Sequence, residues 1–236
     1  MRPLALSSAL FTLRNRPSTF SDKPGTAHLI ADLLAENGHL LVADEDQDRV
    51  LVVDPASGTV LRSFPVGRNP YAMLLSPDGE SVLVSSWSTA QVLEYRLSDG
   101  KELARIPVGA HPTEMLWLPA PIRRRAADDD NPASASSRLA VASANTNFVY
   151  VLEDQHGSWR VKEKIKVALT PRQPVGMTPS SLSLSPDKRR LYVACFDANA
   201  VAVIDVAGSA SKVLGFLPTG WYPTAVRALH DGRLVV

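Results

Sequence analysis

The stretch SLSLSPDKRRLYVACFDANAVAVIDV, from Ser181 to Val206, decides the fold. Two apolar runs flank an SPDK turn at Ser185 to Lys188, and a third run ends at Asp205. Proline presets φ and aspartate bonds its own backbone, so a tight turn is expected there. Val, Leu and Ile at period two predict β-strands in all three runs.

The pattern repeats along the chain. The motif VGxxP, which becomes TGWYP in its last copy, places prolines at Pro70, Pro112, Pro179 and Pro223. The spacings are 42, 67 and 44 residues, and a more divergent unit begins near His28, where the proline is replaced. A period of about forty residues is typical of a four-stranded propeller blade.

These units predict an all-β protein, a β-propeller of four-stranded antiparallel blades with about four and a half blades present. Residues 28–236 form the propeller, with a low-complexity insertion at 119–137 in place of the third SPDG turn. Ile30 to Glu36 reads locally as a helix, but the repeat register makes it a strand. Further strands are expected at Tyr71–Leu75, Val82–Ser86, Val92–Tyr95, Leu191–Cys195 and Val201–Asp205.

Composition narrows the function classes. Lys and Arg total 25 against 24 for Asp and Glu, so no long-range field attracts nucleic acid. The single cysteine, Cys195, excludes an internal disulfide, and no zinc-type spacing occurs, so neither a metal nor another cofactor is expected. No run approaches the roughly 18 apolar residues of a membrane span.

The amino terminus offers weak targeting evidence. Arg2 precedes an apolar run from Leu4 to Leu13, roughly the length of a secretory h-region. Residues 1–27 are therefore interpreted as a signal remnant or a strand. A periplasmic or extracellular location is favoured, and a cytoplasmic one stays open.

The quoted stretch and the recurrent VGxxP resemble the YVTN β-propeller repeat proteins of the YncE-like group, over roughly His28 to Val236. The segment GFLPTGWYPTAV, Gly215 to Val226, is also similar to propellers that precede an alkaline-phosphatase-like or phosphoesterase domain in some bacterial proteins. The resemblance implies that the chain is the amino-terminal part of a larger protein and an open, incomplete part of a seven-bladed ring. The first unit departs from the pattern because it lacks the proline, and the third because it lacks the SPDG turn.

One face is expected to hold a binding site for an unknown protein or small molecule. If the strand after each proline is innermost, the loops before the prolines and those after the second strands share the mouth of the channel. Aromatic rings supply contact area and amides supply oriented hydrogen bonds. The candidates are Arg68, Asn69, Tyr71, Trp87, His111, Asn145, Asn147, Phe196, Asp197, Trp221 and Tyr222.

Structural alternatives apply to several of these residues. Trp221 and Tyr222 are equally consistent with packing between blades, and His111 is interpreted as structural or solvent-facing rather than as a metal ligand. Asp44, Asp54 and Asp205 recur at strand ends, where turn-forming or backbone-bonding roles are expected.

These observations lead to two hypotheses about the function. The first is a non-catalytic binding or scaffolding module, with no catalytic residues. The alternative is a lactonase-type propeller hydrolase, which would need convergent His, Glu and Arg side chains or an acidic metal site. The sequence supplies only His111 and Arg68 at the expected channel mouth.

Overall fold

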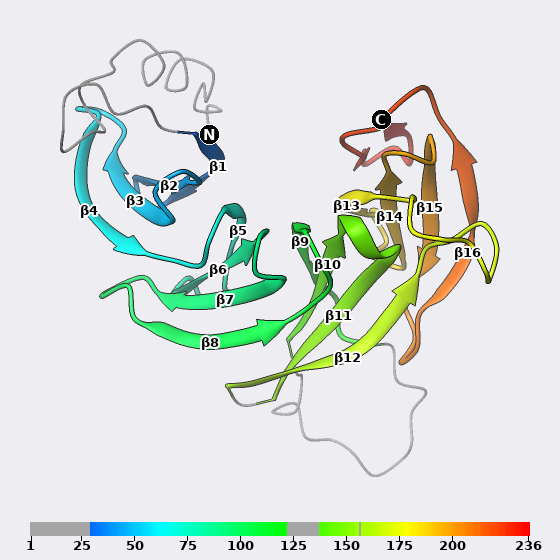
Figure 1. Ribbon diagram of the computed structural model, residues 1–236, viewed down its shortest axis with the longest axis horizontal. Coiled ribbons are helices and arrows are strands. Elements are labelled where there is room, and N and C mark those ends of the chain that lie inside the picture. Colours follow the sequence, from blue (N-terminus) through cyan, green and yellow to red (C-terminus); the bar gives the residue numbers. More distant parts are fainter. Residues whose placement is uncertain (1–28, 122–136, 156) are drawn as a thin grey trace.

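The computed structural model describes residues 29–121, 137–155 and 157–236. They form four antiparallel four-stranded sheets and one two-stranded sheet, which follow one another around an arc (Figure 1). We call these sheets blades 1 to 5 in chain order. Blade 1 holds β1 (Ile30–Glu36), β2 (His39–Asp44), β3 (Arg49–Asp54) and β4 (Thr59–Pro65); blade 2 holds β5 (Pro70–Leu75), β6 (Ser81–Ser86), β7 (Gln91–Arg96) and β8 (Glu102–Pro107).

The remaining blades follow the same order. Blade 3 holds β9 (Pro112–Leu118), β10 (Arg138–Ser143), β11 (Phe148–Gln155) and β12 (Ser158–Lys166), with one short 3-10 turn at Ala144–Thr146. Blade 4 holds β13 (Pro179–Leu184), β14 (Arg190–Cys195), β15 (Ala200–Asp205) and β16 (Lys212–Pro218); blade 5 holds β17 (Arg227–Ala228) and β18 (Leu234–Val235).

This arrangement is a β-propeller, as the repeat predicted. The first strands of the blades, β1, β5, β9, β13 and β17, contact one another in series on the inside of the arc (Figure 1). All five further strands expected from the sequence are confirmed, and Ile30–Glu36 is strand β1, paired with β2. Tertiary pairing therefore overrides the local helical pattern of that segment.

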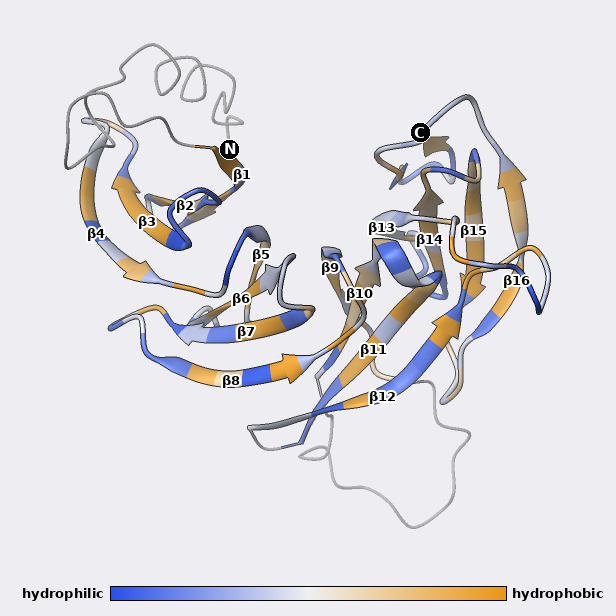
Figure 2. Cartoon of the chain, in the orientation of Figure 1, coloured by the Kyte–Doolittle hydropathy of each residue, from blue (hydrophilic) through white to orange (hydrophobic). Residues whose placement is uncertain are grey.

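The core lies between neighbouring blades. The second and third strands are buried on both faces, so runs such as β6 lack the polar alternation of a surface strand. Outer strands such as β12 alternate between exposed and partly buried residues. In Figure 2 the apolar colour accordingly concentrates along the sheets of the arc, while many of the turns are polar.

The VGxxP motif has a structural explanation at each blade junction. The residue before the proline has a left-handed backbone at Asn69, His111, Thr178 and Tyr222, with φ between 48° and 54°. A Cβ on Gly109 would lie 2.6 Å from the Tyr150 ring. The motif glycine thus permits a close approach at Gly109, and likewise at Gly67, whereas a Cβ at Gly176 or Gly220 would meet nothing within 4 Å.

Some predictions lie outside the described residues. These are the amino-terminal segment 1–27, the part of the insertion at 122–136, and His156. In the ranges that are described, no helix is long and apolar enough to cross a membrane.

Candidate functional site

The loops before the first strands and after the second strands lie on one side of the blades, as expected. Hydrogen bonds link the two sets: Trp87 N donates to Asn69 O, Ala144 N to His111 O, and Phe196 N to Thr178 O. We call the surface that these loops form the channel-mouth face. The eleven residues proposed from the sequence lie in these loops or at the strand ends beside them, and one of them, Asn147, is buried.

The structure brings Trp87 and His111 together. Their ring centroids are 3.6 Å apart and the planes differ by 9°, so the rings stack across the junction of blades 2 and 3. A stack this close occupies one face of the imidazole. His111 is placed as an aromatic partner of Trp87, which fits the structural interpretation of this histidine.

A second aromatic group lies at the junction of blades 4 and 5. The ring of Phe196 stacks on Tyr222 at 4.8 Å, and Trp221 meets Tyr222 edge-on at 6.1 Å. Tyr222 is half exposed, whereas Trp221 is 83% exposed. The two positions that the sequence could not separate therefore differ: Tyr222 packs between blades, and Trp221 projects into solvent.

The other candidates divide into exposed and structural positions. Ser88 Oγ donates a hydrogen bond to Asn69 Oδ1, and the Asp197 carboxylate accepts a hydrogen bond from Thr178 Oγ1 at 2.5 Å. Asn147 is buried, and its Oδ1 accepts hydrogen bonds from Gly176 N and Met177 N, so it anchors the loop before β13. Arg68, Tyr71 and Asn145 are exposed.

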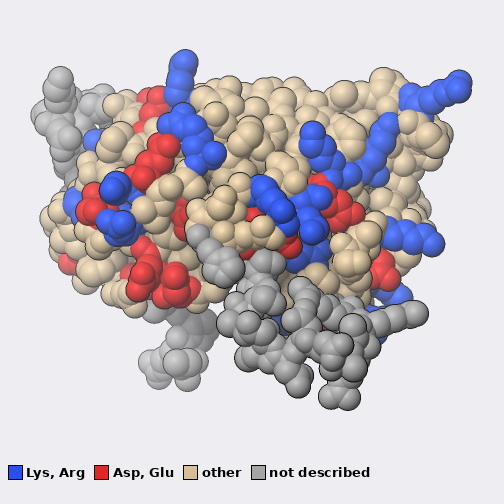
Figure 3. All heavy atoms as spheres, turned by 90° about the horizontal axis from the view of Figure 1, so that it is seen from below, with Lys and Arg blue, Asp and Glu red and all other residues tan. Residues whose placement is uncertain are grey.

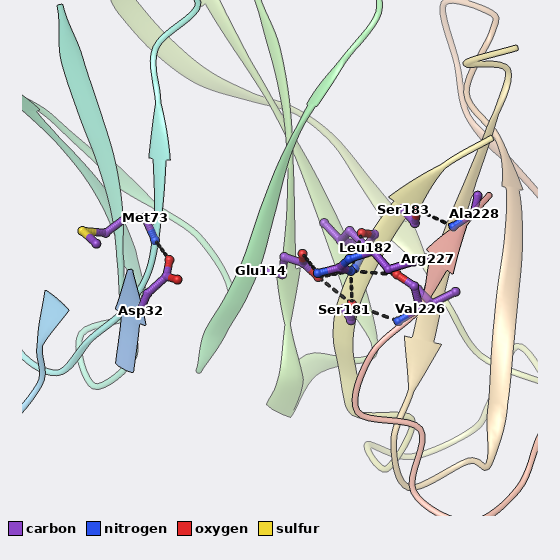
Figure 4. A network of polar contacts seen from close by, with 9 residues as sticks. All are labelled: Asp32, Met73, Glu114, Ser181, Leu182, Ser183, Val226, Arg227 and Ala228. Carbon is purple, nitrogen blue, oxygen red and sulfur yellow. Dashed lines mark hydrogen bonds and ion pairs between the residues drawn. The ribbon is translucent and has the colours of Figure 1, made fainter. Parts of the chain in front are cut away.

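The inner strands carry a polar network that the sequence interpretation missed. Figure 4 shows Glu114 of β9 facing Ser181 of β13 and Arg227 of β17. Glu114 Oε2 accepts hydrogen bonds from Ser181 Oγ at 2.6 Å and Leu182 N at 2.7 Å. Arg227 completes an ion pair with Glu114 at 3.0 Å. The network therefore joins blades 3, 4 and 5 along the channel wall.

Asp32 of β1 repeats this arrangement at the other end of the arc. Its Oδ2 accepts a hydrogen bond from Met73 N of β5 at 2.6 Å (Figure 4). Burial raises the pKa of Asp32, bonds from Met73 N and Leu33 N oppose the rise, and the charge of Glu114 adds to it. In the strand pairing Ile30 faces Asp44 as Pro70 faces Ser86, so Asp32 and Glu114 each stand two residues after equivalent positions, Ile30 and Pro112. The sequence register began the first unit near His28 and therefore did not align the two carboxylates.

The described side chains include neither a reactive thiol nor a group of metal ligands. Burial raises the pKa of the Cys195 thiol to about 12, so its thiolate is not available near neutral pH. Among residues 29–121, 137–155 and 157–236, no three His, Cys, Asp or Glu side chains group closely enough to hold a metal ion. On the face seen in Figure 3, basic and acidic side chains are interspersed.

Two of the three strand-end aspartates, Asp54 and Asp205, bond to the turn that follows them, as the sequence suggested, whereas Asp44 pairs with a side chain. Asp54 accepts hydrogen bonds from Ala56 N and Ser57 Oγ, and Asp205 accepts one from Ala207 N. The Ser57 and Ala56 hydrogen bonds lower the pKa of Asp54. Asp44 is buried and pairs with Arg49 at 3.1 Å.

No family model and no curated protein matches the sequence. Solved structures do resemble the fold. A protein from Lactobacillus plantarum has a TM-score of 0.66 at 17% identity, over 89% of this chain and 64% of that one. A candidate 6-phosphogluconolactonase from Bacteroides fragilis has a TM-score of 0.62 at 15% identity, over 89% and 60%. A streptogramin B lyase has a TM-score of 0.62 at 14% identity, over 87% and 60%.

The chain thus spans between 60% and 64% of the length of these three structures. At such low identity the likeness supports the propeller architecture alone, because one fold hosts many unrelated functions.

Proposed function

We propose that this chain is a non-catalytic recognition or scaffolding propeller of the YVTN, YncE-like type, and that it binds a protein or small molecule at the channel-mouth face. The recurrent VGxxP motif supports the repeat type. The proposal also includes a phosphoesterase-like domain in a larger protein, for which the segment Gly215 to Val226 is the support, and a periplasmic or extracellular location.

The exposed side chain of Trp221 carries the binding proposal. A tryptophan is rarely left 83% exposed on a protein surface, because its indole buries a large apolar area when it is covered. Trp221 stands beside Tyr222, which is fixed by its stack on Phe196. An exposed aromatic held by a rigid neighbour is the usual form of an interface anchor.

Affinity capture from an extract of the source organism tests this proposal. The parent chain, Trp221→Ala and Leu214→Ala are compared as baits, since Leu214 is also exposed but lies on the outer strand β16. We expect a species that the parent and the Leu214 variant retain and that Trp221→Ala loses. Equal capture by all three baits contradicts a site at Trp221.

Lactonase-type hydrolysis is the second candidate, and one observation favours it. Glu114 and Arg227 lie 3.0 Å apart in the channel wall, so the chain brings together a Glu and an Arg that this chemistry requires. Their mutual pairing and the bonds to Ser181 and Leu182 equally suit a structural role.

Hydrolysis of 6-phosphogluconolactone, followed by proton release, separates the two candidates. The recognition proposal expects the parent and Glu114→Gln to match the uncatalysed rate. Turnover that Glu114→Gln abolishes, while the folded content stays unchanged, would establish the hydrolase instead.

A further inference from the structure

A cavity of about 460 Å³ opens between blades 1 and 2, away from the channel-mouth face. It lies beside the turn that joins β1 to β2, the turn that precedes β6 and the turn that follows β7. Its volume falls within the range of small-molecule sites. The proposed function does not use this cavity.

The floor of the cavity is apolar. Leu41 and Val52, neighbours across the β2–β3 pair, contribute from blade 1, and Leu97 contributes from blade 2. Leu41 and Val52 retain only 2% and 5% of their exposure, so their positions are fixed by the core. Because so little of these two side chains is left exposed, a ligand gains apolar contact chiefly at Leu97, which is only partly buried.

Arg62 of β4 spans the mouth of the cavity. Its guanidinium donates to Ser98 O at 2.6 Å and to Leu97 O, both in blade 2. These acceptors are neutral carbonyl groups, and no carboxylate of the described residues pairs with Arg62. The guanidinium has five N–H groups, so it keeps both charge and donors for an anionic group.

Two carboxylates also line the cavity, one from each blade. Glu36 ends β1 and Glu80 precedes β6, and in the described part of the chain neither carboxylate forms a hydrogen bond or ion pair. The other lining cation, Arg96, is already paired with Asp99 at 3.1 Å. The arginines and carboxylates of the walls thus include one guanidinium without an acidic partner and two carboxylates without a basic one, and the imidazole of His39 also lines the cavity.

The next junction differs at the corresponding place. Trp117 and Trp159 of blade 3 lie against blade 2, with ring centroids 6.1 Å apart. Trp117 Nε1 donates to Leu75 O at 2.7 Å, and Trp159 Nε1 donates to Glu94 Oε2 at 2.9 Å. Two indoles occupy that junction, whereas charged side chains surround open volume in the first.

We propose that the cavity between blades 1 and 2 binds a small zwitterion with an apolar side chain, the chemistry of an apolar α-amino acid. The ligand carboxylate pairs with Arg62, its ammonium group with Glu36 and Glu80, and its side chain packs against Leu97 over the floor that Leu41 and Val52 form. Such a ligand satisfies every charge that the walls leave unpaired, which neither an anion nor a cation alone does.

Binding of phenylalanine, phenethylamine and 3-phenylpropionate to the whole chain tests the proposal. These probes share a phenyl group and carry both charges, the positive charge, or the negative charge. Shifts of the Leu41 and Val52 methyl resonances at low ionic strength report occupancy. We expect phenylalanine to bind most tightly and the single-charge probes about tenfold more weakly, the equivalent of one charged hydrogen bond.

Variants assign the binding to the cavity. Arg62→Gln and Glu80→Gln should each weaken phenylalanine about fivefold to tenfold. Arg105→Gln makes the same charge change as Arg62→Gln but on β8, outside the cavity, and should leave binding unchanged. Val52→Phe fills the cavity while keeping all its charges, and should abolish binding even if Arg62→Gln loosens the junction.

Three results would overturn the proposal. They are no shift at the Leu41 and Val52 methyl groups with phenylalanine, equal or tighter binding of a single-charge probe, and unchanged binding to Val52→Phe. Loss of capture by the Trp221 variant is a separate readout, so failure here leaves the recognition proposal standing.

Discussion

The junction of blades 1 and 2 and the junction of blades 2 and 3 share one backbone design and differ in what fills them. At both, a glycine permits close approach and a left-handed residue precedes the next first strand. Trp117 and Trp159 occupy the second junction, and Arg62 bridges the first beside a cavity. The repeat backbone therefore sets the spacing of blades, and non-repeated side chains decide whether a junction is closed or open.

The largest expected loss of stability is at the junction of blades 2 and 3, which the two indoles fill. Trp159→Ala removes an indole that packs near Trp117 and leaves Glu94 Oε2 without its donor. Because Trp159 is partly buried, we expect a loss of about 3 kcal/mol in the free energy of unfolding, measured by urea denaturation. Leu103→Ala, an exposed change on β8, should cost less than about 0.5 kcal/mol. Equal losses would show that the indoles do not close this junction.

The shared backbone design is tested at its glycines. A Cβ at Gly67 would meet Leu93 Cδ1 at 2.6 Å, and one at Gly109 would meet Tyr150 Cε2 at 2.6 Å. Gly67→Ala and Gly109→Ala should therefore each cost about 2 kcal/mol of unfolding free energy. Gly215→Ala has open space around its Cβ and is expected to be neutral or slightly stabilising. A large difference between the two junction glycines would refute a common design.

Leu41 and Leu83 occupy equivalent positions on β2 and β6, one beside the cavity and one in a filled junction. Leu83→Phe should cost about 2 kcal/mol by overpacking. Leu41→Phe can expand into the cavity and should cost less than about 1 kcal/mol. Thermal or urea unfolding compares the pair, and equal costs would mean that the cavity is closed in solution.

The smallest expected effect is a pH-dependent change in stability at Asp32, which lies between blades 1 and 2. Burial raises its pKa, so the folded state holds this proton more tightly than the unfolded chain does. The stability that the protonated carboxyl contributes is present at low pH and lost as the pH rises through the raised pKa. Asp32→Asn cannot ionise, so the variant should gain stability relative to the parent between acidic and neutral pH. A pH-independent difference between the two unfolding curves would contradict this account.

Local signals predicted the blades. The SPDK turn and the period-two runs around it are short-range features, so Arg190–Cys195 and Ala200–Asp205 form strands where the sequence indicated. The repeat register correctly assigned Ile30–Glu36, whose local pattern alone suggested a helix. The aromatic positions of the channel-mouth face also followed from the register, because each residue's place in its repeat sets its loop.

The sequence did not predict which side chains of different blades pair with each other. Arg227 of blade 5 and Glu114 of blade 3 are 113 residues apart. Their contact crosses blade 4, where Arg227 also bonds the small side chain of Ser181. Trp221 and Tyr222 could not be told apart from the sequence, because it is the stack on the Phe196 ring that makes Tyr222 a packed side chain and leaves Trp221 exposed.

By itself, then, the sequence determined the repeat, its strands and turns, and the face on which each loop emerges. These depend on backbone preferences and on apolar periodicity within about forty residues. The tertiary structure decided which carboxylates meet which cations along the inner strands, and which junction keeps a cavity. Those outcomes depend on the sizes of side chains from different blades, and no local pattern encodes how such side chains fill the space between two sheets.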